Sequence, residues 1–167
     1  TTLFRSKNGS QSLGCIFFPR GGQHTQLFVY KDENGNFPVA DKLIELANYY
    51  GFDGYFINAE EQLPADFMPL YDEFVSYMTA NGMYIQVYAS NPYGQNNQGS
   101  WGGIDYYNKD ATVFSNWIKK PGCEQGASSL YMNPDPSKSH VDGSVAIMES
   151  LGLDARNTVF NTLEAGQ

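Results

Sequence analysis

The sequence contains few of the residues that metal, redox and Ser-His-Asp sites require. Its 167 residues include 2 cysteines, Cys15 and Cys123, and 2 histidines, His24 and His140, all far apart along the chain. They cannot form a zinc-binding pattern, and no Gly-x-Ser-x-Gly motif occurs. We therefore expect no metal, no cofactor, buried or idle thiols, and neither a metalloenzyme nor a Ser-His-Asp hydrolase.

Clusters of positive charge and long apolar runs are also missing. The chain has 10 Lys and Arg against 18 Asp and Glu, which gives a formal net charge of -8, and no basic cluster occurs. A nucleic-acid partner or an anionic membrane surface is therefore disfavoured. No run reaches the ~20 apolar residues of a membrane-spanning helix, so we expect no membrane insertion. The first residues do not resemble a signal peptide, but a chain that starts at Thr1 leaves its location open.

Apolar and aromatic residues are abundant. The hydrophobic content of 41% and aromatic content of 15% are enough for one folded domain over residues 1–167. Aromatic residues together with many Asn, Gln and Tyr are typical of sugar sites, because sugar rings have apolar faces fringed by hydroxyl groups. An aromatic core explains the same composition, and composition alone favours that interpretation.

Segments of strand and helix character alternate along the chain. Pro38 suits the first position of a helix, and Gly51 suits the cap after it. Residues 91–103 are expected to form a surface loop, because they are rich in Asn, Gly and Pro and their apolar residues do not recur with a helix or strand period. The expected strands are 13–18, 55–59, 83–89, 130–132 and 159–163, and the expected helices are 38–50, 67–81, 111–119 and 140–151.

This alternation indicates an α/β fold with a parallel sheet and right-handed crossovers. One candidate is an open doubly wound sheet, although no Gly-rich phosphate loop follows any strand. The other is a (β/α)8 barrel of the TIM type, which typically needs ~250 residues, so five strands would form only part of it. In both folds the functional site lies at the carboxyl ends of the strands.

Asn58 and Glu60 are the strongest catalytic candidates. They lie two residues apart at the end of an expected strand, so their side chains should leave the same face. A carboxylic acid can donate a proton, and an amide can hold another group because it donates and accepts hydrogen bonds at once. The other residues expected at this rim of strand ends are Phe18, Tyr88, Asn133 and Glu164, and Gln86 should share a face with Tyr88.

Three other acidic residues need separate interpretations. Glu61 should face away from Glu60 and is expected to be an ordinary surface charge, and Asp53, which precedes the strand, is expected to fix a turn. Glu164 is a competitor: if it faced Glu60 across the site, a mechanism with two carboxylates would be available.

The segment 38–60 resembles the endo-β-N-acetylglucosaminidases of glycoside hydrolase family 85. Those enzymes have a similar helix followed by a strand of the pattern Gly-Phe-Asp-Gly-aromatic-x-Ile-Asn-x-Glu, as in 51–60 of this chain. Val87 and Ala89 depart from the family, which has Trp and Asp there. Weaker similarities follow in the family's order at 13–18, 86–90, 104–108, 130–133 and 159–164.

The resemblance implies a catalytic (β/α)8 barrel, of which this chain would supply strands two to six, and cleavage of the β-1,4 bond between the two N-acetylglucosamines of the N-glycan core. In this family the substrate's own 2-acetamido group acts as the nucleophile and forms an oxazoline. Glu60 would then be the acid and base, and Asn58 and Tyr88 would bind the acetamide. The other expected substrate-binding residues are Phe18, Gln86, Trp101, Tyr106, Asn133 and Glu164.

The resemblance also implies a setting for the chain. The remainder of a parent enzyme, or another chain, would have to complete the barrel. Bacterial members are commonly secreted or surface proteins, which implies an extracellular or cell-surface location, with a cytoplasmic one still open. The alternative to an enzyme is a non-catalytic carbohydrate-binding or scaffold fragment, and the loss of Trp at Val87 leaves the preferred glycan class open.

Overall fold

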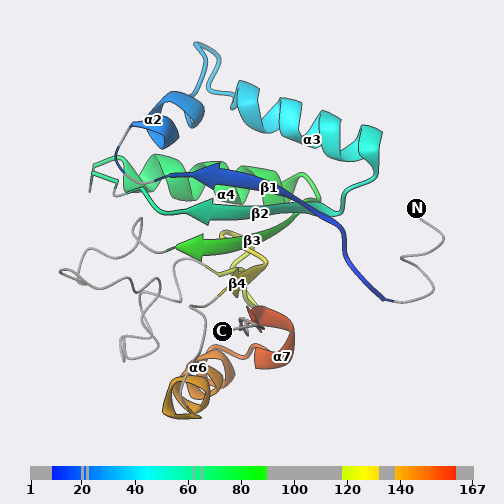
Figure 1. Cartoon of the computed structure of the whole chain (residues 1–167), viewed down its shortest axis with the longest axis vertical. Coiled ribbons are helices and arrows are strands. Elements are labelled where there is room, and N and C mark those ends of the chain that lie inside the picture. Colours follow the sequence, from blue (N-terminus) through cyan, green and yellow to red (C-terminus); the bar gives the residue numbers. More distant parts are fainter. Residues whose placement is uncertain are drawn as a thin grey trace, which may run out of the picture.

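The structure is a computed structural model that describes residues 9–19, 21, 23–61, 63–64, 66–89, 118–131 and 138–160. Five strands alternate with helices along these residues (Figure 1). The strands are β1 (Leu13–Phe18), β2 (Gly54–Ala59), β3 (Tyr84–Ala89), β4 (Ser129–Tyr131) and β5 (Val159–Phe160). The helices are α2 (His24–Phe28), α3 (Pro38–Tyr50), α4 (Met68–Ala80), α6 (Lys138–Ser150) and α7 (Ala155–Thr158).

The five strands form one parallel sheet in the order β1-β2-β3-β4-β5. Each strand lies beside its neighbour in the chain, so the order never reverses as it would at the switch point of a doubly wound sheet. Of the two candidate architectures, the partial (β/α)8 barrel is therefore confirmed. The sheet does not close, and β1 and β5 form its two edges in the described part of the chain.

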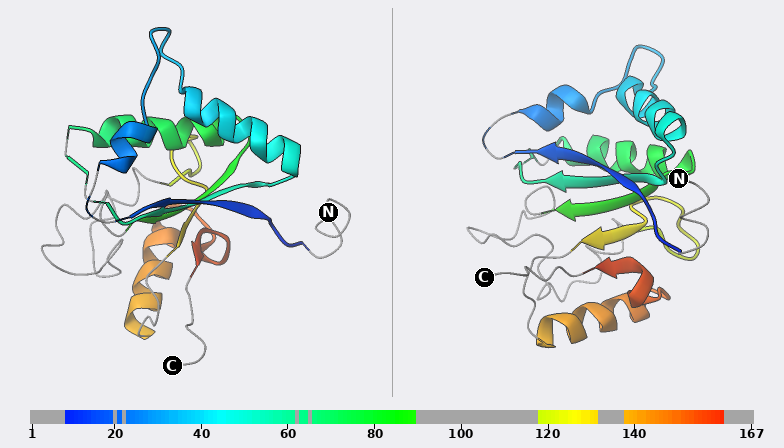
Figure 2. Two further views of the ribbon diagram at one scale, coloured as in Figure 1. Left: turned by 45° about the horizontal axis from the view of Figure 1, so that its top comes forward. Right: turned by 45° about the vertical axis from the view of Figure 1, so that its right-hand side comes forward.

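The helices cover one face of the sheet. Figure 1 and Figure 2 show α2, α3 and α4 together on one side of β1, β2 and β3, and α6 and α7 beside β4 and β5. Alternate strand residues point toward these helices and are buried, which places the opposite set on the inner face of the partial barrel. The buried set on the strands is Ile16, Phe18, Tyr55, Ile57, Ala59, Ile85, Val87 and Leu130. The inner face consists of Cys15, Phe17, Phe56, Asn58, Gln86, Tyr88, Ser129 and Tyr131.

Two glycines explain the geometry around β2. Gly51 ends α3 in the left-handed conformation, with a φ of 76°, as the sequence predicts. At Gly54 a Cβ atom would lie 1.9 Å from the backbone oxygen of Tyr84, so only glycine lets β3 approach β2 this closely. Both glycines belong to the motif at 51–60.

The expected elements agree with the structure except at a few points. The strand at 13–18 and the helix at 38–50 have the predicted bounds, whereas the short helices α2 and α7 were not predicted. Ile118 pairs with Ala127 in an isolated bridge, so the helix expected at 111–119 does not include it, and 111–117 and the loop at 91–103 lie outside the described residues. Both cysteines are free, and Cys15 is exposed rather than buried.

Candidate active site

Asn58 lies near the carboxyl end of β2, in one row with Phe17 of β1 and Tyr88 of β3. Its Oδ1 atom is buried and accepts no hydrogen bond from any described residue. A buried acceptor without a partner costs about 1–3 kcal/mol, and in a folded protein such a group calls for a functional explanation. The Asn58 Oδ1 is therefore an acceptor whose hydrogen bond is not supplied by the described residues.

Glu60 follows directly after β2. Its backbone N–H donates a hydrogen bond to the carbonyl of Phe18 at 2.9 Å, so the pairing of β1 with β2 extends one step beyond the strands. Because the alternation continues through this step, the Glu60 side chain leaves the same face as Asn58. A partly buried carboxyl group thus lies beside the Asn58 amide.

Aromatic side chains accompany this pair on the inner face. The ring of Tyr131 in β4 lies 5.0 Å from the ring of Phe56 and 6.0 Å from the ring of Tyr88, measured between ring centres. Gln86 lies deeper in the barrel, where its Nε2 donates to Ser129 Oγ at 3.2 Å. Tyr131 was not among the candidates from sequence, although the alternation of β4 beside the buried Leu130 could have indicated it.

The structure corrects the prediction for Phe18. This residue is 3% exposed, lies on the helix-covered face and packs edge-on against Phe28 at 5.3 Å. Its register partner on β2 is Ala59, whereas Asn58 is paired with Phe17, which is 52% exposed. The aromatic residue of β1 beside the catalytic candidates is therefore Phe17.

The prediction that Glu61 is a surface charge is also wrong. Glu61 is 2% exposed and accepts hydrogen bonds from the backbone N–H groups of His24 and Thr25 and from the Thr25 hydroxyl. Burial acts to raise the pKa of Glu61, but these hydrogen bonds and the nearby His24 together leave that pKa lowered.

Asp53 has the role expected from the sequence. Its Oδ2 accepts a hydrogen bond from the backbone N–H of Ser12 at 2.7 Å, at the end of β2 away from Asn58. This contact fixes the turn before β2 to the start of β1. Asp53 therefore belongs to the fold rather than to the rim.

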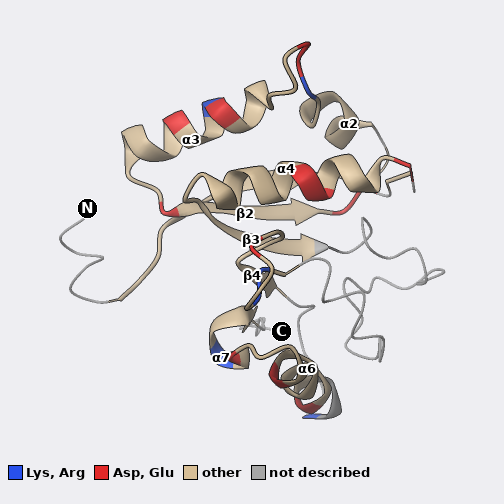
Figure 3. Cartoon of the chain, turned by 180° about the vertical axis from the view of Figure 1, so that it is seen from behind, with Lys and Arg blue, Asp and Glu red and all other residues tan. Residues whose placement is uncertain are grey.

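Four candidates from the sequence, Trp101, Tyr106, Asn133 and Glu164, lie outside the described residues. Among the residues that are described, no three or more His, Cys, Asp and Glu side chains gather as they would around a metal ion. No helix in this part of the chain is both long and apolar enough to cross a membrane. Figure 3 shows Lys and Arg at several separate places on the described elements, with acidic residues on α3, α4 and α6. Lys119 and Lys120 are adjacent in the sequence.

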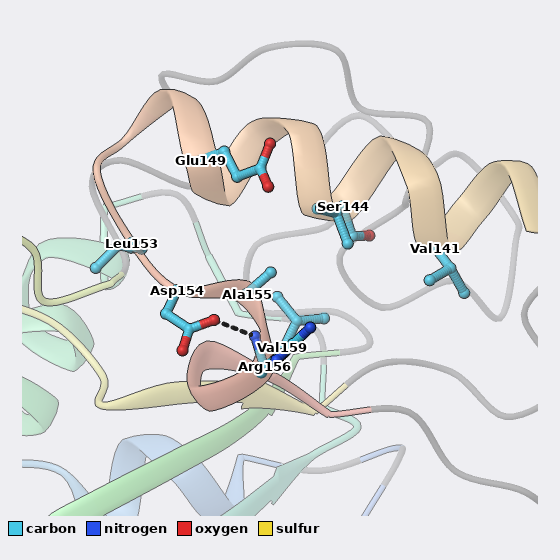
Figure 4. A pocket seen from close by; sticks show the side chains of 9 residues that line it. Val141, Ser144, Glu149, Leu153, Asp154, Ala155, Arg156 and Val159 are labelled. Atoms are coloured by element: carbon cyan, nitrogen blue, oxygen red, sulfur yellow. Dashed lines mark hydrogen bonds between the residues drawn. The ribbon is translucent and has the colours of Figure 1, made fainter.

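A cavity of about 520 Å³ lies between α6 and α7, apart from the Asn58–Glu60 pair (Figure 4). Its lining includes Ser144, Glu149 and Arg156, and the Asp154 side chain beside them accepts a hydrogen bond from the Arg156 backbone N–H at 3.0 Å. That bond caps the four-residue helix α7. The cavity borders the edge strand β5 and includes none of the residues that the sequence proposes for catalysis.

Comparisons with known proteins agree with this arrangement. The family model for glycosyl hydrolase family 85 matches residues 3–167, whereas curated proteins give no match. Among solved structures, the glycoside hydrolase domain of Endo-D from Streptococcus pneumoniae R6 is similar, with a TM-score of 0.63 and 24% identity. The alignment covers 88% of this chain and 24% of that one, so this chain spans about a quarter of its length. The resemblance seen at 38–60 is confirmed, and the chain belongs to glycosyl hydrolase family 85.

Proposed function

We propose that this chain forms part of the catalytic barrel of an endo-β-N-acetylglucosaminidase. The reaction would be hydrolysis of the β-1,4 bond between the two N-acetylglucosamines at the core of an N-linked glycan. The observation that carries the proposal is the Asn58–Glu60 pair at the carboxyl end of β2, with the Asn58 Oδ1 buried and without a hydrogen-bond partner among the described residues. Family membership supports the class of enzyme, a glycoside hydrolase.

The mechanism assigns one task to each side chain. Glu60 donates its proton to the leaving oxygen while the substrate's acetamido oxygen attacks the anomeric carbon, so one C–O bond breaks, another forms, and an oxazolinium ion results. Asn58 Oδ1 accepts the acetamide N–H, which directs the acetamido oxygen at the anomeric carbon and stabilises the positive charge that develops on the group. The Glu60 carboxylate then takes a proton from water, which opens the ring with net retention.

Tyr88 supports this assignment. It lies beside Asn58 in the next strand, so its side chain shares the inner face and the depth in the barrel at which the acetamide would bind. A phenol hydroxyl in that position can give the acetamide a second hydrogen-bonding partner. Tyr131 holds the ring of Tyr88 from the other side.

Two alternatives to the proposed function rest on other features of the chain. The unclosed sheet favours a non-catalytic carbohydrate-binding fragment, because an open barrel face can hold a sugar without enclosing the reacting bond. A two-carboxylate mechanism would use Glu164 with Glu60. The Asn58 oxygen, which has no hydrogen-bond partner among the described residues, favours substrate assistance, because the N–H of the substrate's acetamide is a donor from which it can accept a hydrogen bond.

The test is incubation with a high-mannose glycopeptide, both of the chain alone and of a longer protein that carries it. Release of the glycan, with a single N-acetylglucosamine left on the peptide, is the expected result for the longer protein. Binding without release by both forms would favour the carbohydrate-binding alternative. An extracellular or cell-surface location, where N-glycans are accessible, is part of the proposal.

A further inference from the structure

Glu61 is the least expected charged residue in the structure. Its carboxylate is buried on the helix side of β2, and three donors surround it: His24 N–H at 2.9 Å, Thr25 N–H at 2.7 Å and the Thr25 hydroxyl at 2.6 Å. These contacts join positions 36 and 37 residues apart in the chain. A buried carboxylate is tolerated only when its oxygens are hydrogen-bonded in this way.

The donors belong to the first residues of α2. This helix has five residues, and Gln23, at its N-cap position, makes no side-chain capping bond. The first N–H groups of a helix lack partners within it and need an acceptor from elsewhere. Glu61, two residues after the end of β2, supplies that acceptor. Its hydrogen bonds therefore link α2 to the segment after β2.

Two sets of hydrogen bonds hold the backbone at Glu60. On one side its own N–H is bonded to the carbonyl of Phe18, the last residue of β1, at 2.9 Å. On the other side the next residue is bonded to the start of α2. The backbone that carries the Glu60 side chain is thus tied to β1 and to the helix that follows β1, instead of ending in a loop held at one point.

We propose that Glu61 is a positioning residue that sets the place of the Glu60 carboxyl group. This inference rests on the function proposed above, in which Glu60 donates the proton. Glu61 itself touches no substrate, because its side chain leaves the opposite face. A shift of about 1 Å in a reacting group can cost on the order of a hundred-fold in rate, so loss of this anchor should appear in the chemical step.

The test compares Glu61→Ala and Glu61→Gln in a full-length protein that carries this chain. Glu61→Ala removes all three hydrogen bonds, whereas Glu61→Gln keeps the side-chain length and one acceptor oxygen. We expect single-turnover cleavage of the glycopeptide to slow by about ten- to hundred-fold for Glu61→Ala and by less for Glu61→Gln, with little change in KM. The matched control is Glu45→Gln on α3, where an exposed Glu pairs with Lys42; its rate should be unchanged.

A second substrate separates positioning from a general loss of folded protein. It carries the same glycan on 4-nitrophenol, a leaving group that needs no proton, and release of the phenol is followed in the first turnover. A positioning role predicts that phenol release slows much less than glycopeptide cleavage. Equal slowing on both substrates, or no slowing on either, would overturn the inference, and amide exchange at His24 and Thr25 shows whether α2 is still formed.

The proposed function and this inference fail differently. If the unsubstituted protein releases no glycan, the proposed function fails and the inference falls with it. If that protein is active and Glu60→Gln inactivates it, but the Glu61 variants cleave both substrates at the control rate, only the positioning role is refuted.

Discussion

Glu60 is the one side chain in the proposed mechanism that must both give and take a proton. Glu60→Gln keeps the size and polarity of the side chain and removes this ability. Because general acid–base catalysis contributes about 10²–10⁴-fold, we expect at least a hundred-fold slower release of the natural glycan with little change in glycan binding. Cleavage measured by mass spectrometry of the glycopeptide checks the rate, and activity close to that of the unsubstituted protein would refute the role of Glu60.

Asn58 has a different task, and its replacement should have a different signature. Asn58→Ala removes the acceptor that would hold the acetamide, so formation of the oxazoline from the glycan should slow strongly. Hydrolysis of a preformed oxazoline skips that step and still has Glu60 as the base, so it should continue. The test is to measure the rates of Asn58→Ala on the glycan and on the preformed oxazoline. A mechanism that uses Glu60 with Glu164 predicts no difference between the effects on these two substrates.

The sequence predicted this pair because a spacing of two residues in a strand fixes a common face without any knowledge of the sheet. It wrongly predicted that Phe18, rather than Phe17, shares that face. Both are apolar and both suit a strand, and only the register of β1 against β2 places Phe17 beside Asn58. The prediction for Glu61 was wrong for a related reason, because a Glu after a strand is usually solvated and its partners here lie 36 and 37 residues away in the chain.

At the scale of elements, the same buried carboxylate makes the anchoring of α2 depend on pH. The folded pKa of Glu61 lies below its ordinary value of 4.5, so the charged form stabilises the folded state. This contribution is complete above about pH 4.5 and is lost as the pH falls through the lower, folded pKa. We expect Glu61→Gln to reduce the free energy of unfolding most at neutral pH. The difference in this free energy between the unsubstituted protein and the variant, called the stability gap, should narrow below pH 4.5.

Urea unfolding of the unsubstituted protein and of Glu61→Gln between pH 7 and pH 3 measures the stability gap. Glu45→Gln again serves as the control, because its carboxylate is exposed and its gap should be small throughout. A gap for Glu61→Gln that stays constant, or widens toward acid, would contradict the direction of the pKa shift.

The contact between β2 and β3 gives a prediction of another kind. A Cβ at Gly54 would lie 1.9 Å from the Tyr84 carbonyl oxygen, and that oxygen belongs to the backbone and cannot turn away as a side chain could, so Gly54→Ala must push the strands apart. Overpacking of this kind typically costs about 1–3 kcal/mol or more. Gly35→Ala is the matched control, since Gly35 also has a positive φ, of 82°, but open space around it. Thermal unfolding should show a clearly larger loss at Gly54.

Long helices with marked ends were predicted well, and short helices were not. Helix α3 has Pro38 at its start, Gly51 at its end and an apolar stripe between them, so local rules were sufficient. Helices α2 and α7 have five and four residues, too few to show a period. The N-terminal N–H groups of α2 also donate to Glu61, which is distant in the sequence, so no local pattern predicts this contact.

At the scale of the whole molecule, the sheet has apolar surface along its β1 edge. Leu27 of α2 is 78% exposed and Tyr49 of α3 is 81% exposed, and Phe17, Leu46 and Tyr50 are exposed as well. Two cavities, of about 540 and 400 Å³, lie along the same edge. Sequence alternation predicted a parallel α/β sheet and the family resemblance implied a partial barrel, but only the strand order and these exposed side chains show which edge needs covering. We infer that further barrel strands and their helices cover it in the active enzyme.

The 167-residue chain by itself should therefore associate with itself. Light scattering at rising protein concentration is expected to show species heavier than the monomer, and a longer protein that carries the chain should stay monodisperse, because an uncovered parallel edge with apolar neighbours is a site of association. Leu46→Lys combined with Tyr49→Lys adds charge at this edge and should reduce the association of the isolated chain. Glu149→Lys makes a comparable charge change on α6, away from β1, and should have a smaller effect. An isolated chain that stays monomeric and cleaves the glycopeptide would mean that the inner face of five strands is sufficient for catalysis.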